Sequence, residues 1–366
     1  MGLLFGSDLI EDALAAKIDG LKVPGAVVLA RSASKGEWTA TFGTRSIGGD
    51  EPVTMEDHFR IGSNTKTMTA AVVLQLAQDG ALDLDDPVSA YRPDVPNGHN
   101  ITIANLLEMR SGLASYTLDE AFEARLDDEP GYAWRPAELL GIAFACPPSF
   151  SPGAKYEYSN TNTVLLGLIV EQLTEGSLED AFRQRIFDPL GLTETTMPAV
   201  GDTSIPAPHP RGYMFGTNVT TLTEPGVPAS QRAEFEAGTL RPGDYTDSSP
   251  SWAWAAGSAI STAADAARYV EALVDGELLG ADQQRKWLAS FRSTSDDPDS
   301  PLYGYHLGKF GPMIGHTGQI PGFNSFIGRD PEQRNTLVVF TSLVNGPDGQ
   351  MPVFELAQII VAALYE

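Results

Sequence analysis

Strand-like sequence lies at both ends of this chain, and helix-like sequence fills the middle. Two segments near the start, 26–31 and 37–42, are rich in the β-branched and aromatic residues of strands, and a short turn separates them. Three more strand-like segments lie near the end, at 306–310, 323–329 and 336–342. The simplest arrangement that buries all five is one antiparallel sheet assembled from both ends of the chain.

The helix-like segments fall into two groups. Apolar residues at helical spacing predict helices close to the strands in sequence, at 8–20, 65–78, 262–276 and 353–364. Shorter helical patterns alternate with Pro- and Gly-rich loops in the middle, at 104–109, 136–145, 162–173 and 178–186, whereas 201–250 is expected to be irregular.

These patterns predict an α/β (α+β) fold with two parts. Residues 1–88 and 251–366 would form a discontinuous domain, an antiparallel sheet with flanking helices. Residues 89–250 would form a mainly helical domain inserted into it. A cleft between the two parts is the default place for a binding site.

The charge balance excludes some functions. The chain has 366 residues with 48 acidic against 24 basic side chains, a formal net charge of −24. Such a field repels phosphate backbones and anionic membranes, so we expect no nucleic-acid partner. An acidic surface that keeps the protein soluble is the simpler interpretation, and attraction of cationic substrates is the alternative. No apolar run approaches the length of a membrane span.

Cysteine and histidine usage gives little sign of redox or metal chemistry. Cys146 is the single cysteine, so no internal disulfide can form, and its apolar neighbours predict a buried, inert thiol. The histidines outside the motifs below are too scattered for a metal pattern, and no metal or cofactor is implied: His58, His99, His209 and His306.

The first residues do not predict a signal peptide. They lack its basic region and its long apolar run. The expected location is the cytoplasm, or outside the cell after removal of a leader.

The segment 61–66, Ile-Gly-Ser-Asn-Thr-Lys, indicates nucleophilic catalysis. Ser63 stands where a helix begins, and Lys66 follows at i+3, so both side chains lie on one helical face. A serine hydroxyl needs a base near neutral pH, and a desolvated lysine can supply one. A second Ser-x-x-Lys match, Ser32 to Lys35, lies in the predicted hairpin turn, where the two side chains need not meet. We interpret it as a chance match.

Tyr158-Ser-Asn160 forms a second candidate motif just before a helix. Tyr158 would act as a base, or as the proton donor to a leaving group. Asn160 would bind the lysine or a substrate amide. The alternative is structural, with Asn160 or Thr161 capping the helix and a packed aromatic beside it.

Gly315-His-Thr-Gly318 is the third motif. His316 would hold a positive charge or relay a proton, and Thr317 would bind a substrate carboxylate. Gly318 would let a ligand approach the backbone, and the N–H of Gln319 would form an oxyanion hole with that of Ser63. The alternative is an edge-strand histidine. Trp252 would line the cleft or pack in the interior.

The three motifs together resemble the serine penicillin-recognising enzymes, which include DD-carboxypeptidases, class C β-lactamases and esterase-like relatives. The resemblance rests on the order Ser-x-x-Lys, Tyr-x-Asn, His-Thr-Gly. Further stretches look like that family too: Pro24-Gly-Ala-Val-Val, Ile101-Thr-Ile-Ala-Asn-Leu-Leu, Ser111-Gly-Leu, Pro189-Leu-Gly-Leu and Ala255-Ala-Gly-Ser.

The resemblance implies an acyl-enzyme on Ser63, with Lys66 and Tyr158 handling protons and Asn160 and His316 supporting the site. His316 stands where class C β-lactamases usually have Lys, which favours a DD-peptidase-like hydrolase that acts on peptides or amides with a D-residue at the scissile bond. A covalent β-lactam adduct is then expected. An intracellular acyltransferase or peptide cyclase, a carboxylesterase or weak β-lactamase, and a non-catalytic binding domain stay open as alternatives.

Overall fold

The computed structural model describes residues 7–365. Within that range an eight-stranded antiparallel sheet forms the centre of the molecule, in the order β2-β1-β12-β11-β10-β9-β8-β7. Its strands are β1 (Gly25–Ser32), β2 (Gly36–Gly43), β7 (Arg292–Ser293), β8 (Leu302–Tyr303), β9 (Gly308–Phe310), β10 (Met313–Ile320), β11 (Phe323–Arg329) and β12 (Thr336–Thr341). Residues 1–6, on which the signal-peptide prediction rests, lie outside the described residues.

Strands from the two ends of the chain lie side by side in this sheet, next to its β2 edge. Strand β1 pairs with β12 along its length, for example Val28 with Val339. The predicted sheet assembled from both chain ends is therefore confirmed.

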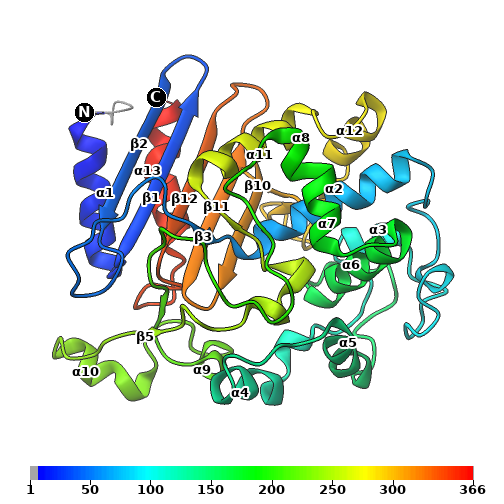
Figure 1. Cartoon of the computed structure of the whole chain (residues 1–366), viewed down its shortest axis with the longest axis horizontal. Coiled ribbons are helices and arrows are strands. Elements are labelled where there is room, and N and C mark those ends of the chain that lie inside the picture. The colour runs from blue at the N-terminus through cyan, green and yellow to red at the C-terminus, as the bar shows by residue number, and fades with distance from the viewer. Residues whose placement is uncertain (1–6, 366) are drawn as a thin grey trace.

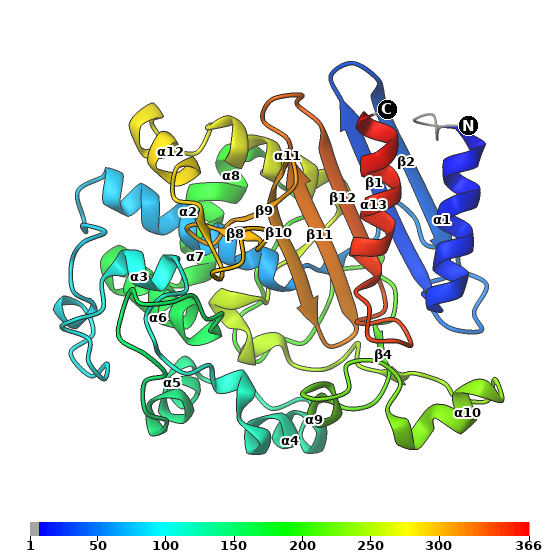
Figure 2. The same cartoon turned by 180° about the vertical axis from the view of Figure 1, so that it is seen from behind.

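Helices cover both faces of the sheet. The terminal helices α1 (Asp8–Leu21) and α13 (Pro352–Tyr365) pack together on one face, and α11 (Ala263–Asp275) lies on the other (Figures 1 and 2). The remaining helices are α2 (Thr65–Gln78), α3 (Ile103–Leu107), α4 (Glu120–Asp128), α5 (Pro136–Ala145), α6 (Asn160–Thr174), α7 (Leu178–Phe182), α8 (Asp188–Leu190), α9 (Asn218–Thr221), α10 (Arg232–Glu236) and α12 (Ala281–Leu288).

Two short ribbons and several tight turns complete the chain. Strand β3 (Phe59–Arg60) pairs with β6 (Ile260–Ser261), and β4 (Tyr213–Met214) pairs with β5 (Gly243–Asp244). The segment 201–250 is mostly irregular, as predicted, apart from β4, β5 and three short helical stretches, which are α9, α10 and the 3-10 turn Ala229–Gln231.

The apolar core has two parts, separated by the sheet. On one face Leu14 and Ile360 of the terminal helices pack with Val28 and Val339. On the other face the core runs from the sheet and α11 into the helices of the middle segment, where it includes Leu165. This second cluster contains residues of both predicted domains, so the core does not mark a border between them. The domain boundaries at 88/89 and 250/251 therefore stay a prediction.

Three sequence expectations need correction. Strand β9 begins at Gly308 rather than His306, because His306 has a left-handed backbone (φ 52°) and its N–H donates to the Leu107 carbonyl. Helices α4 and α12 had no predicted counterpart. Cys146 is exposed, not buried, because it caps the C-terminus of α5, whose apolar face turns Leu139 and Ala143 inward instead.

In the part of the chain that the structure describes, no helix combines the length and the apolar character needed to cross a bilayer.

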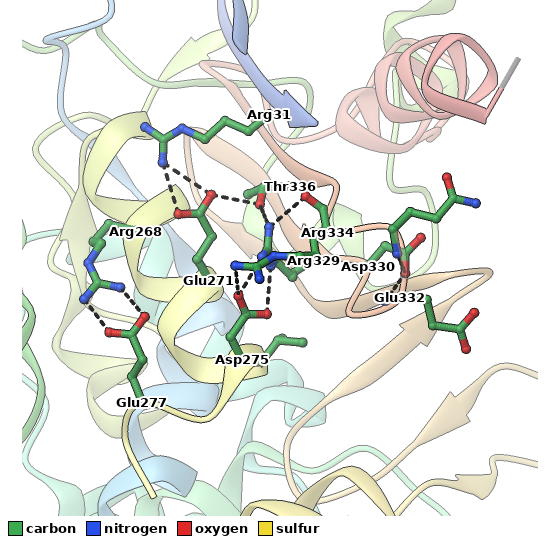
Figure 3. A network of polar contacts seen from close by, with 12 residues as sticks. Arg31, Arg268, Glu271, Asp275, Glu277, Arg329, Asp330, Glu332, Arg334 and Thr336 are labelled. Atoms are coloured by element: carbon green, nitrogen blue, oxygen red, sulfur yellow. Dashed lines mark hydrogen bonds and ion pairs between the residues drawn. The ribbon is translucent and has the colours of Figure 1, made fainter. Parts of the chain in front are cut away.

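A polar network fastens α11 to the sheet (Figure 3). Arg329 of β11, whose side chain is 5% exposed, donates from Nη2 to Asp275 Oδ2 at 2.6 Å and from Nε to Oδ1 at 3.1 Å. One turn earlier on α11, Glu271 accepts from Thr336 of β12 and pairs with Arg31 of β1. The network thus joins α11 to three neighbouring strands.

Asp275→Ala is expected to destabilise the fold by about 3–5 kcal/mol, because it leaves the buried Arg329 guanidinium without its carboxylate. Glu277→Ala is the matched control, because it breaks only the exposed pair with Arg268 and should cost less than about 1 kcal/mol. Urea unfolding measures both changes. Equal losses would contradict this account of the network.

Candidate active site

Ser63 lies in a tight turn between strand β3 and helix α2. The turn η1 (Gly62–Asn64) requires glycine at its first position, because Gly62 has φ 52° and a Cβ there would lie 2.6 Å from the backbone nitrogen of Gln319. The missing side chain lets the turn rest directly against β10. Ser63 is half-buried at the end of this contact.

Side chains on both sides lock the turn in place. Asn64 Nδ2 donates to Ser325 Oγ of β11 at 2.8 Å, and Ser325 Oγ donates to the Ile61 carbonyl at 2.7 Å. Thr65 Oγ1 donates to the Gly62 carbonyl at 2.8 Å. The sheet therefore fixes the position of the Ser63 hydroxyl.

Lys66 points at Ser63 from the first turn of α2. Its Nζ donates to Ser63 Oγ at 2.9 Å and to the carbonyl oxygen of Ala256, in the turn η7 (Trp254–Ala256), at 2.8 Å. The residue is 0% exposed, and within residues 7–365 it forms no salt bridge. Burial lowers the pKa of Lys66 well below its usual value, which favours the neutral amine that a base requires.

The second Ser-x-x-Lys match lies far from any such arrangement. Ser32 ends strand β1, and the Nζ of Lys35 donates to the carbonyl of Ala363 in α13. Ser32 Oγ contacts Ser34 instead. The interpretation of this pair as a chance match is confirmed.

Tyr158 completes a cluster around the Ser63 hydroxyl. Its phenol lies close enough to the Ser63 side chain for that side chain to lower the pKa of Tyr158, and the Nζ of Lys66 lies 4.9 Å from the centre of its ring. Burial raises the pKa of Tyr158 far above its ordinary value, so the resting phenol keeps its proton. Of the two roles considered for Tyr158, proton donor fits this environment better than base.

His316 is a neutral side chain within the sheet. Its Nδ1 faces the Thr317 carbonyl and its Nε2 lies 3.0 Å from the Tyr303 hydroxyl, so Nδ1 donates and Nε2 accepts the phenolic proton. Burial and the nearby Lys66 lower the pKa of His316 to about 3. The expected positive charge is therefore wrong, and the edge-strand interpretation is wrong too, because β10 lies between β9 and β11.

Asn160 is the first residue of α6, and Ser159 occupies the N-cap position. The capping interpretation of Asn160 and Thr161 is therefore wrong. The side-chain Nδ2 of Asn160 donates to Thr117 Oγ1 at 3.1 Å, whereas the lysine's hydrogen bonds go to Ser63 and Ala256. Asn160, Trp252 and Gln319 line one cavity of about 230 Å³.

Backbone geometry at Gly318 and Gln319 suits an oxyanion hole. A Cβ at Gly318 would lie 1.9 Å from the Ile61 carbonyl, so only glycine lets β10 come this close to the turn that carries Ser63. The backbone nitrogen of Gln319 then lies beside Gly62, one residue from Ser63. Thr317 is half-buried, and its carbonyl accepts from His316.

Sequence reasoning missed four residues of this region: Ala256, Tyr303, Thr117 and Glu123. Ala256 belongs to the family-like stretch Ala255-Ala-Gly-Ser, but its role could not be predicted, because any residue type can offer a backbone carbonyl as a hydrogen-bond acceptor. The other three carry no spacing relative to Ser63, Tyr158 or His316 that sequence alone could exploit.

Residues 7–365 contain no group of three or more His, Cys, Asp or Glu side chains placed to hold a metal ion. His306 is buried with Nε2 at 3.0 Å from Thr163 Oγ1, and His58 lies beside Glu194.

Tyr303→Phe is expected to cost about 1–3 kcal/mol of stability, because it removes the hydroxyl that satisfies the buried Nε2 of His316. Tyr305→Phe is the control, because no hydrogen bond of its hydroxyl is found among the described residues. Denaturant unfolding of both variants measures the difference. A Tyr305→Phe loss as large as that of Tyr303→Phe would count against this assignment.

Comparisons with known proteins agree on one family. The Beta-lactamase family model matches residues 10–359. Putative penicillin-binding protein PbpX of Bacillus subtilis (strain 168) is 26% identical over 289 residues, which are 78% of this chain and 62% of that protein. The chain thus spans less than two thirds of the length of the first curated relatives it matches.

Solved structures cover the chain almost completely. A D-stereospecific amidohydrolase from Streptomyces sp. is 31% identical with a TM-score of 0.81, and the match covers 98% of each chain. D-amino acid amidase from Ochrobactrum anthropi SV3, complexed with L-phenylalanine amide, is 26% identical with a TM-score of 0.81 and covers 97% of this chain and 99% of that one. With its antiparallel sheet, its flanking helices and a family match over nearly its whole length, this chain belongs to the Beta-lactamase family and has the β-lactamase/DD-peptidase fold.

Proposed function

We propose that this protein is a serine hydrolase that forms an acyl-enzyme on Ser63 and cleaves amides with a D-residue at the scissile bond. The observation that carries the proposal is the buried Nζ of Lys66, 2.9 Å from Ser63 Oγ. A lysine that stabilised the fold through its charge would have a carboxylate partner. Lys66 instead has a hydroxyl and a carbonyl, which suits a neutral base.

The proposed chemistry follows from the neighbours of Ser63. As Ser63 Oγ attacks the substrate carbonyl, the neutral amine of Lys66 takes the hydroxyl proton. The N–H groups of Ser63 and Gln319 bind the oxyanion that forms. The phenol of Tyr158 gives its proton to the leaving nitrogen and regains one from the Lys66 ammonium. Water then attacks the acyl-enzyme by the reverse of these transfers.

The supporting residues have positioning roles in this proposal. His316 is neutral and is hydrogen-bonded to Tyr303, so it packs beside the site without a positive charge. A positive charge there would repel the Lys66 ammonium that forms during acylation. Asn160, Thr317 and Trp252 would contact the substrate beside the reacting carbonyl.

Similarity to solved enzymes supports the choice of D-residue amides. The two neighbours described above are named a D-stereospecific amidohydrolase and a D-amino acid amidase. The family's penicillin-binding members add the expectation of a covalent β-lactam adduct on Ser63.

Ser63→Ala and Lys66→Met are each expected to lower kcat/KM for D-phenylalaninamide by about 10³-fold or more, because each removes a group that acts only in bond making. Ser32→Ala and Lys35→Met are matched controls from the chance motif and should keep the wild-type rate. Ammonia release measures all four variants, with L-phenylalaninamide, a short-chain ester and a chromogenic cephalosporin assayed in parallel.

Intact-protein mass spectrometry with a fluorophosphonate supplies the second test. An adduct on Ser63 is expected in the wild type and absent in Ser63→Ala. Turnover of the ester alone would overturn the D-amide substrate, and a wild type without an adduct would overturn the acyl-enzyme. Adding an amine to the assay separates hydrolysis from acyl transfer, because a transferase converts the amine into a new amide.

A further inference from the structure

A buried carboxylate lies in the cavity next to the catalytic cluster. Glu123 of α4 lines the same cavity of about 230 Å³ as Asn160, Trp252 and Gln319. Gln319 connects this cavity with the catalytic cluster. Its backbone nitrogen lies beside Gly62, and Gln319 is also one of the residues that line the cavity. Glu123 therefore lines a cavity that extends to Gln319, the residue whose backbone lies against the turn that carries Ser63.

The carboxylate of Glu123 has no polar partner within residues 7–365. The residue is 8% exposed, and among the described residues its carboxylate makes no hydrogen bond or ion pair. Its backbone N–H donates to the Asp119 carbonyl, as is usual within a helix, and this bond does not involve the carboxylate. A buried carboxylate without a partner is unfavourable, and a structural one would normally be paired.

The charged residues near Glu123 make its ionised form still less favourable. Asp127 lies one helical turn later and is held by the backbone N–H groups of Asn218 and Val219, so it is fixed close by as a second negative charge. Arg125, the nearest cation on the helix, turns away to stack on the Tyr132 ring at 3.6 Å and to pair with Glu129. Burial and Asp127 raise the pKa of Glu123 to about 8.

We propose that this cavity is an ammonium subsite, in which Glu123 binds a free amino group on the acyl part of the substrate, close to the scissile carbonyl. The proposal rests on the proposed function and narrows its substrate class to amides of amino acids or peptides with an unblocked amine. A bound ammonium group would be the charged partner that Glu123 lacks among the described residues. Its positive charge would offset the cost of burying the ionised carboxylate.

The net charge of the chain agrees with a cationic substrate. With a formal net charge of −24, the field of the protein attracts a positively charged amine and repels an anionic one. The other residues that line the cavity combine side-chain amides and an indole with apolar groups, among them Asn160, Asn218, Trp252, Met214 and Ile320.

Three amides with the same phenyl group test the subsite: D-phenylalaninamide, N-acetyl-D-phenylalaninamide and 3-phenylpropanamide. The wild type should prefer the first. Glu123→Gln keeps the size of the side chain and removes its charge, so it should lower kcat/KM for D-phenylalaninamide by about 10- to 100-fold and leave the other two nearly unchanged. Glu120→Gln, at an exposed glutamate of the same helix, should change none of the three.

The outcomes separate this proposal from the function it rests on. If Ser63 is labelled and amides turn over, but Glu123→Gln lowers all three rates equally, the ammonium subsite is wrong and the acyl-enzyme stands. A wild type that prefers the N-acetylated amide also overturns the subsite. Failure of the proposed function shows instead as a wild type without an adduct on Ser63.

Binding in the absence of turnover provides an independent readout. In a Ser63→Ala background, D-phenylalaninamide should raise the melting temperature, and the shift should disappear when Glu123→Gln is added. An equal shift in both proteins would contradict the subsite.

Stability should also depend on pH through Glu123. Because the folded-state pKa is raised to about 8, the folded protein binds more protons than the unfolded chain between the ordinary glutamate pKa and pH 8, so wild-type stability falls as the pH rises through this window. Glu123→Gln lacks this loss, so its stability relative to the wild type should increase from pH 5 to pH 8.5. Thermal unfolding at the two pH values measures it, and a pH-independent difference would show that the carboxylate is not an uncompensated buried charge.

Discussion

The site depends on the burial of one lysine. Lys66 is 0% exposed, and among residues 7–365 its amine has two hydrogen-bonding partners, the Ser63 hydroxyl and the Ala256 carbonyl. Desolvation penalises the charged form, so the fold itself prepares the base. This requires the rest of the core: α2 is held against the sheet by the turn at Gly62, and that turn fits only because Gly318 allows β10 to approach.

Much of this architecture could be predicted from the sequence, because strands and helices depend on the pattern of apolar and polar residues along the chain. The sheet built from both chain ends followed from where strand-like segments lie, and the helix after Ser63 distinguished it from Ser32. The positions of Tyr158 and His316 followed from motifs in order. What could not be predicted is protonation: His316 is neutral because it is buried beside Lys66 and accepts from Tyr303, and those neighbours come from tertiary packing.

Glu123 is a second residue whose environment could not be predicted from the sequence. Helix α4 is short and charged, so its sequence resembles a solvated surface segment, and nothing in it sets Glu123 apart from Glu120. The difference appears only in the folded chain, where α9 packs against α4 and Glu123 lines a cavity together with Trp252. Among the described residues, Lys66 is buried without an anionic partner and Glu123 is buried without a cationic one. In our proposal, the ammonium group of the substrate supplies the missing partner of Glu123.

The central claim is that a neutral, buried Lys66 activates Ser63, and the pH dependence of Ser63 acylation tests it most directly. The rate of fluorophosphonate labelling, followed by intact-protein mass spectrometry, should rise with pH and reach its plateau well below the ordinary lysine pKa, because Lys66 has already lost its proton there. A rate that keeps rising until the ordinary lysine pKa, or a label on a residue other than Ser63, would contradict the account.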